Sequence, residues 1–191
     1  MNHRSRKRRY IIWILVLLLA AAGAGGGYYF YQNHHTGQQA DQVLDAMYDL
    51  VPHLGDETGA STGPGRDPLA AMSIDGMDIV GCLSIPALEI TAPVAAKGVE
   101  AMNFATWYDG SPVTGLFRIT GGREDLFLNL ASLKPGDRVT FTDMDGVQYR
   151  YMVTTQYHLK NWDEGDNDLM LSYETDDKTH FVVGCTLDYG E

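Results

Sequence analysis

The feature that most constrains this chain is a long stretch near its start that carries no charge. No charged side chain lies between Arg9 and Asp41, and residues 11–31 are almost wholly apolar. As a helix rising 1.5 Å per residue, such a segment spans about 30 Å, the thickness of a bilayer core. It is therefore a membrane segment or a secretion signal, and the folded domain must be built from the rest of the chain.

Two interpretations of this segment compete. The small residues at 20–24 offer a signal-peptide cleavage site, whereas the aromatic residues at 28–31 are typical of a membrane interface. We favour an uncleaved transmembrane anchor over residues 10–31, because the apolar run continues past the cleavage site. The basic tail at residues 1–9 then stays in the cytoplasm by the positive-inside rule. This predicts a single-pass cell-membrane protein with its domain outside.

Charge and cysteine content exclude several classes. Five of the 14 basic residues lie in the first nine positions, so the rest of the chain contains nine basic residues and all 25 acidic ones. Such an acidic body argues against nucleic acid as a partner. Two cysteines rule out a disulfide framework and a four-cysteine zinc site. The acidic residues between Asp163 and Asp177 suggest a calcium site, but a solvated acidic loop is the simpler reading. We predict no cofactor and no metal.

The middle of the chain divides into a helix, a linker and a domain. Residues 40–54 place apolar side chains at helical spacing, with Asp41, Asp45 and Asp49 opposite, which predicts an amphipathic helix. Residues 55–67 are rich in Gly, Pro and Ser and indicate a flexible linker. Helix and linker together form an extracytoplasmic segment at 32–71. The folded domain then occupies residues 72–191.

That domain has the pattern of an all-β protein. Gln148 to Val153 alternates apolar and polar side chains, and Asp145-Gly146 is a hairpin signal between two such runs. Lys134 to Asp137 indicates a second turn. A small barrel or sandwich fits these short strands best. The expected strands cover residues 79–85, 116–120, 138–142, 147–157 and 180–185.

Two cysteines and two histidines of the domain are candidates for chemistry. Cys82 lies inside an apolar run, so we interpret it as a core residue. Cys185 follows an apolar strand and Gly184, and a thiol at such a strand end could be exposed in a groove. His180 lies about 16 Å from Cys185 along an extended strand, too far to act as its base. No motif around His158 marks it as catalytic, so we interpret it as a solvated histidine at a strand end.

Several motifs together resemble the sortase family. Residues 79–94, IVGCLSIPALEITAPV, are similar to the family's first strands, and further matches follow in the same order as in sortases. They comprise Tyr108 to Ser111, Ile119 to Gly121, Leu126 to Leu130, Leu133 to Asp137 and Phe181 to Thr186. The resemblance covers about residues 72–191 and extends to the N-terminal anchor.

The resemblance implies a cysteine transpeptidase on the outer face of a Gram-positive cell membrane. Its thiol would cleave a Leu-Pro-x-Thr-Gly-like sorting signal, and an amine of the cell wall or a pilin would accept the acyl group. Cys185 matches the family's nucleophile. The family's histidine position is filled by Gly122, and the sequence ends before an arginine-bearing last strand.

These departures set the expectation for fold and function. We expect an incomplete sortase-like barrel of about seven strands with an open edge. The chain is then truncated, a degenerate copy, or completed by another chain. Cys185 is the predicted catalytic residue, and we expect little transpeptidase activity. The alternative is a non-catalytic sortase-like module that binds a peptide or partner.

Overall fold

A computed structural model describes residues 39–51, 54, 67–99, 104–121, 126–161 and 165–189. The predicted tail and anchor at 1–31, nearly all of the linker and Gly122 lie outside the described residues. Among the helices that the structure describes, none is long and apolar enough to cross a membrane. The membrane anchor therefore stays a prediction.

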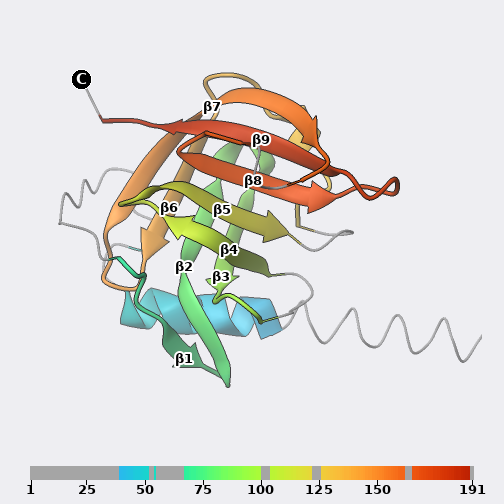
Figure 1. Cartoon of the computed structure of the whole chain (residues 1–191). Helices are drawn as coiled ribbons and strands as arrows, with labels where there is room; N and C mark the ends of the chain where they lie inside the picture. Colours follow the sequence, from blue (N-terminus) through green and yellow to red (C-terminus); the bar gives the residue numbers. More distant parts are fainter. Residues whose placement is uncertain are drawn as a thin grey trace, which may run out of the picture. The chain divides into compact units, whose positions relative to one another are not determined.

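The described domain is a single sheet that closes on itself (Figure 1). The strand order is β1-β2-β3-β4-β5-β8-β9-β7-β6, and β2 also pairs with β6, so eight of the nine strands form a closed barrel. The strands are β1 (Met72–Ile74), β2 (Met77–Ile85), β3 (Ile90–Ala95), β4 (Ala105–Ser111), β5 (Gly115–Gly121), β6 (Arg138–Asp143), β7 (Gln148–Leu159), β8 (Leu169–Glu174) and β9 (His180–Leu187), with two 3-10 turns, η1 (Pro86–Leu88) and η2 (Leu130–Ser132).

The expectation of an incomplete, open barrel of about seven strands is therefore wrong. The closing contact is antiparallel and runs from Gly81 opposite Asp143 to Ser84 opposite Thr140. The count of about seven rested on a missing last strand, and it left out β8, which lies within the segment interpreted as a solvated acidic loop. Its first four residues are all buried, so the strand lacks the alternation by which a half-buried strand is recognised. Because β8 pairs with β5 and β9, and β9 pairs with β7, the barrel closes without a further strand.

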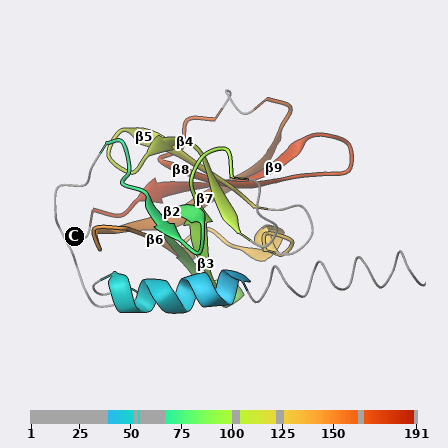
Figure 2. The ribbon, with the colours of Figure 1, turned by 90° about the horizontal axis from the view of Figure 1, so that it is seen from below.

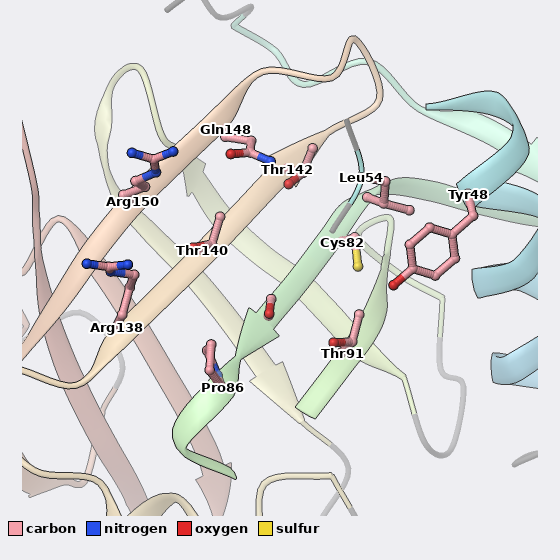
Figure 3. A pocket seen from close by; sticks show the side chains of 11 residues that line it. Tyr48, Leu54, Cys82, Pro86, Thr91, Arg138, Thr140, Thr142, Gln148 and Arg150 are labelled. Atoms are coloured by element: carbon pink, nitrogen blue, oxygen red, sulfur yellow. The ribbon is translucent and has the colours of Figure 1, made fainter. Parts of the chain in front are cut away.

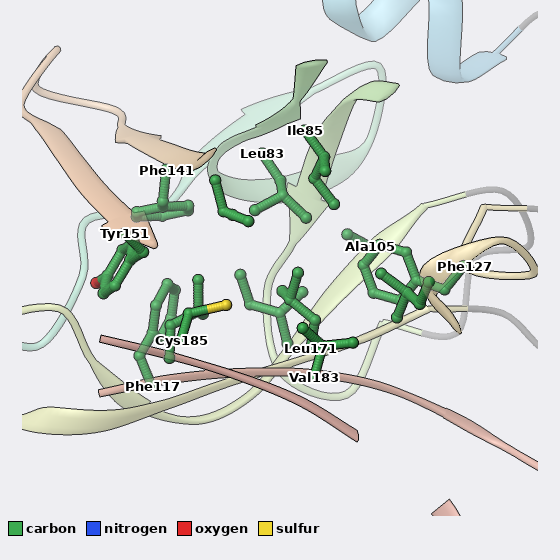
Figure 4. Packing of buried hydrophobic residues seen from close by; sticks show 14 of the residues in the cluster. Leu83, Ile85, Ala105, Phe117, Phe127, Phe141, Tyr151, Leu171, Val183 and Cys185 are labelled. Carbon is green, nitrogen blue, oxygen red and sulfur yellow. The ribbon is translucent and has the colours of Figure 1, made fainter. Parts of the chain in front are cut away.

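The barrel interior is filled by one apolar cluster to which every barrel strand contributes. At its centre the rings of Phe117 and Phe141 meet edge to face with centroids 4.8 Å apart (Figure 4). Tyr151, Val183 and Cys185 belong to the same cluster. The inward-facing side chains thus exclude water from the barrel interior, and this burial of apolar surface is the main source of stability in a domain of this size.

A helix over residues 39–50 packs outside the barrel, near the predicted range of 40–54 (Figure 2). Val43 and Met47 are fully buried, whereas Asp41, Asp45 and Asp49 are exposed, as an amphipathic helix requires. The buried face forms a second cluster with residues of β1, β2 and β3, including Ile79 and Cys82. The helix belongs to the same compact unit as the barrel.

The predicted hairpin between β6 and β7 is confirmed. Gly146 has φ +81°, the left-handed conformation that the Asp-Gly pair predicts. The carboxylate Oδ1 of Asp143 accepts hydrogen bonds from the backbone N–H groups of Asp145 (3.0 Å) and Val147 (2.9 Å). Burial raises the pKa of Asp143, so this turn contains a carboxylate whose charged form is partly desolvated.

Candidate functional site

Cys185, the predicted nucleophile, lies in the barrel core. Its side chain is 0% exposed and points inward among Phe117, Tyr151 and Val183 (Figure 4). Burial raises the pKa of the thiol from 9.0 to about 12. The expectation that this thiol is accessible in a groove is wrong, and its catalytic role stays a prediction.

The alternation of side chains along β9 explains why the thiol of Cys185 is buried. In β9 the inward-facing positions are Phe181, Val183 and Cys185, and the next residue, Thr186, is exposed. The strand also continues to Leu187 instead of ending at the cysteine, with β7 and β8 paired on its two sides. A thiol at this position therefore has neither a free strand end nor an open face.

The end of β5 that precedes Gly122 lies far from Cys185. Cys185 pairs with Leu169 of β8, which pairs with Phe117 at the beginning of β5. Gly121, at the other end of β5, lies four residues from Phe117 and thus about 13 Å away along the strand. The strand register therefore separates Cys185 from the end of β5 at Gly121.

Both histidines of the domain lie far from Cys185 along the strands. His158 is exposed and pairs with Phe181, whose ring it meets edge to face at 5.3 Å. Phe181 lies four residues from Cys185 on β9, about 13 Å along the strand. His180 begins the same strand, at the end farther from the cysteine. The sequence-based exclusion of His180 on distance is consistent with this placement.

Cys82 is the second thiol and is buried too. It is 3% exposed and faces outward from β2 into the cluster beneath the helix. Burial raises its pKa to about 12, an effect that a backbone hydrogen bond with Ala92 only partly offsets. The prediction that Cys82 is a core residue is confirmed.

Two of the described acidic residues before β9 accept hydrogen bonds that shape the loops around this strand. Asp177 accepts hydrogen bonds from the side chains of Thr175 and Thr179, which lower its pKa to about 2. Asp168 accepts a hydrogen bond of 2.8 Å from the backbone N–H of Leu187 and so ties β8 to the end of β9. Within the described ranges, no group of three or more His, Cys, Asp or Glu side chains could hold a metal ion.

A pocket of about 170 Å³ lies on the outer face of the barrel beside the helix (Figure 3). Tyr48 and Leu54 form the helix side, Arg138 and Arg150 lie on the β6–β7 side, and Cys82 is between them. The remaining lining residues are Ser84, Pro86, Thr91, Thr140, Thr142 and Gln148.

Sequence reasoning did not identify this pocket. Its only trace in the sequence is the alternation of Arg138, Thr140 and Thr142 along one strand and of Gln148 and Arg150 along the next. Such alternation predicts an outward polar face but not a hollow in it. The hollow depends on the helix, which lies about ninety residues away in the sequence.

Comparison with known proteins places this geometry among related folds. A sequence model of the Sortase domain family matches residues 83–190, more than half of the chain. The chain matches none of the curated proteins with which it was compared.

Solved sortase structures share the fold at low sequence identity. Sortase A from Corynebacterium diphtheriae is 16% identical, with 83% of this chain and 96% of that one covered and a TM-score of 0.52. The Clostridium perfringens sortase D5 transpeptidase is 18% identical, with coverages of 58% and 79% and a TM-score of 0.51. Listeria monocytogenes sortase A is 21% identical, with coverages of 58% and 87% and a TM-score of 0.50. These likenesses establish the closed sortase-like barrel.

Proposed function

Because this chain belongs to the sortase family, we propose that it is a sortase-fold module that acts by binding a peptide or partner protein instead of by thiol catalysis. A sortase reaction begins with attack by a cysteine thiolate, and the whole sequence contains only Cys82 and Cys185. The proposal therefore depends on the state of these two thiols.

The observation that carries the proposal is the burial of both thiols. Cys82 is 3% and Cys185 is 0% exposed, and the pKa of each is raised to about 12. At pH 7 a thiol with that pKa is a thiolate in about one molecule in 10⁵. A substrate carbonyl would also have to enter the packed barrel interior to meet Cys185. The low thiolate population and the packed interior both favour binding over covalent chemistry.

The test compares cleavage and binding of one peptide. The full chain in detergent is mixed with a fluorescent Leu-Pro-x-Thr-Gly peptide; turnover, acyl-enzyme mass and fluorescence anisotropy are measured. We expect neither cleavage nor an adduct, but saturable binding that is unchanged in Cys185→Ala. Cleavage or an adduct that disappears in Cys185→Ala would refute the non-catalytic proposal. Absence of binding would refute this peptide as the ligand.

The family match itself favours a second candidate, a cysteine transpeptidase with Cys185 as nucleophile. This function requires a rearrangement that brings Cys185 out of the barrel when substrate binds. It also requires a base, for which Gly122 offers no side chain. Adding a histidine through Gly122→His should then produce Cys185-dependent cleavage, and a lack of cleavage in that variant would count against the candidate.

Location and partners follow the same proposal. We infer a membrane anchor at residues 10–31 with the barrel outside the cell membrane, from the charge-free apolar run and the basic tail. Sorting-signal peptides and amine-bearing cell-wall or pilin components are the partners to test first. Protease added to intact protoplasts should digest the barrel and spare an N-terminal cytoplasmic tag. Survival of the barrel together with cleavage of the tag would reverse the proposed orientation.

A further inference from the structure

We propose that the pocket beside the helix binds a small anionic polyol, meaning a sugar or polyol group that carries a phosphate or a carboxylate. This goes beyond the function proposed above and does not depend on it, because the pocket lies outside the barrel whereas Cys185 points inside.

The first observation that supports this ligand is a row of three hydroxyl groups and one guanidinium group in register across four strands. Thr91 of β3 pairs with Ser84 of β2, Ser84 pairs with Thr140 of β6, and Thr140 pairs with Arg150 of β7. All four side chains line the pocket. Since neighbouring strands are about 4.8 Å apart, the row extends over about 14 Å. A ligand along this row would meet three hydroxyl groups and then a guanidinium group.

A second row of paired side chains lies beside the first and adds further polar groups to the pocket. Cys82 of β2 pairs with Thr142 of β6, and Thr142 pairs with Gln148 of β7. The hydroxyl and amide groups of this row can both donate and accept hydrogen bonds, as sugar and polyol hydroxyls require. Tyr48 adds a phenol from the helix side (Figure 3).

The charge of the pocket is opposite to that of the chain. The two ionisable side chains on its β6–β7 side are arginines, in a chain of net charge -11, and none of the described lining residues is acidic. Because Thr140 lies opposite Arg150, Arg138 and Arg150 are diagonal neighbours on one face of the sheet. Arg138 is exposed. Guanidinium groups in such a pair favour an oxyanion, which they can bind through paired N–H donors.

The backbone around the pocket argues against an extended peptide as the ligand. β2 is hydrogen-bonded to β3 and β6, and β6 is also bonded to β7, so the pocket offers no free strand edge for an added strand. Recognition must then come from side chains alone. The volume of about 170 Å³ suits one small group.

The test is an NMR titration of the ¹⁵N-labelled full chain in detergent micelles with glycerol 3-phosphate, glucuronate, inorganic phosphate and glycerol. We expect saturable shifts on β2, β6 and β7, with a dissociation constant of about 1 mM for the better of the two anionic polyols. A preference for glycerol 3-phosphate would identify phosphate as the anion, and a preference for glucuronate would identify carboxylate. Arg138→Gln should weaken binding about tenfold or more. The control Lys160→Gln removes the same charge outside the pocket and should leave binding unchanged.

Three results would overturn the proposal. The first is no saturable shift with either anionic polyol up to about 20 mM. The second is equal affinity for glycerol or for inorganic phosphate, which would remove the need for the anion or for the polyol. The third is unaltered binding by an Arg138→Gln protein whose spectrum shows that it is folded.

Discussion

The burial of Cys185 leads to a quantitative prediction for its reaction with alkylating reagents. Raising the thiol pKa from 9.0 to about 12 lowers the thiolate population at pH 7 by about 10³-fold. The reagent is also excluded from the packed core until the barrel opens, which lowers the rate further. We therefore expect Cys185 in the native protein to react with iodoacetamide at least about 10³ times more slowly than in the unfolded chain.

The assay uses two variants that each leave a single thiol. Cys82→Ala reports on Cys185 and Cys185→Ala on Cys82, with alkylation followed by intact mass at pH 7 in buffer and in guanidinium chloride. Both thiols should be protected in buffer and react fully in denaturant. If native Cys185 reacts within about tenfold of its unfolded rate while circular dichroism shows a folded barrel, the core assignment of this thiol is refuted, and the transpeptidase candidate gains support.

Three further predictions test the fold. Gly81→Ala should destabilise the domain by about 1–3 kcal/mol or more, because the added Cβ would lie 2.4 Å from the backbone oxygen of Thr142 on β6, where the barrel closes. Thermal unfolding should show this loss, and the control Ser84→Ala should be nearly neutral. Met47→Ala should cost about 2–5 kcal/mol in a urea titration if the helix is docked as described, whereas the exposed Asp45→Ala should change little. Burial raises the pKa of Asp143 in the folded protein above its value in the unfolded chain. The contribution of this side chain to folding stability is therefore most favourable below the pKa of the unfolded chain, and it is lost as the pH rises through the pKa of the folded protein. Asp143→Asn should therefore gain thermal stability relative to wild type from pH 3 to pH 7, and a constant difference would contradict this.

Local patterns in the sequence were sufficient for several elements. The amphipathic helix, the Asp-Gly hairpin and the strand at 147–157 each follow from short-range periodicity or turn chemistry, and each is present in the structure. β8 was missed because burial on both faces removes the alternation that identifies a strand. An eight-strand closed barrel was out of reach from the sequence alone, since the β2–β6 pairing joins segments about sixty residues apart.

By itself, the sequence determined the all-β class, the family resemblance and the existence of only two thiols, because these depend on residue identity and local order. It also determined that Cys82 and Cys185 each lie in an apolar strand. Only the tertiary structure decided which face of its strand each thiol occupies: Cys185 points into the barrel and Cys82 toward the helix. It alone decided that two arginines and a row of hydroxyl groups border one pocket. The physical reason is that a strand's alternation defines two faces, but only sheet closure and helix docking decide which face is inside and which part of the outer surface is hollow.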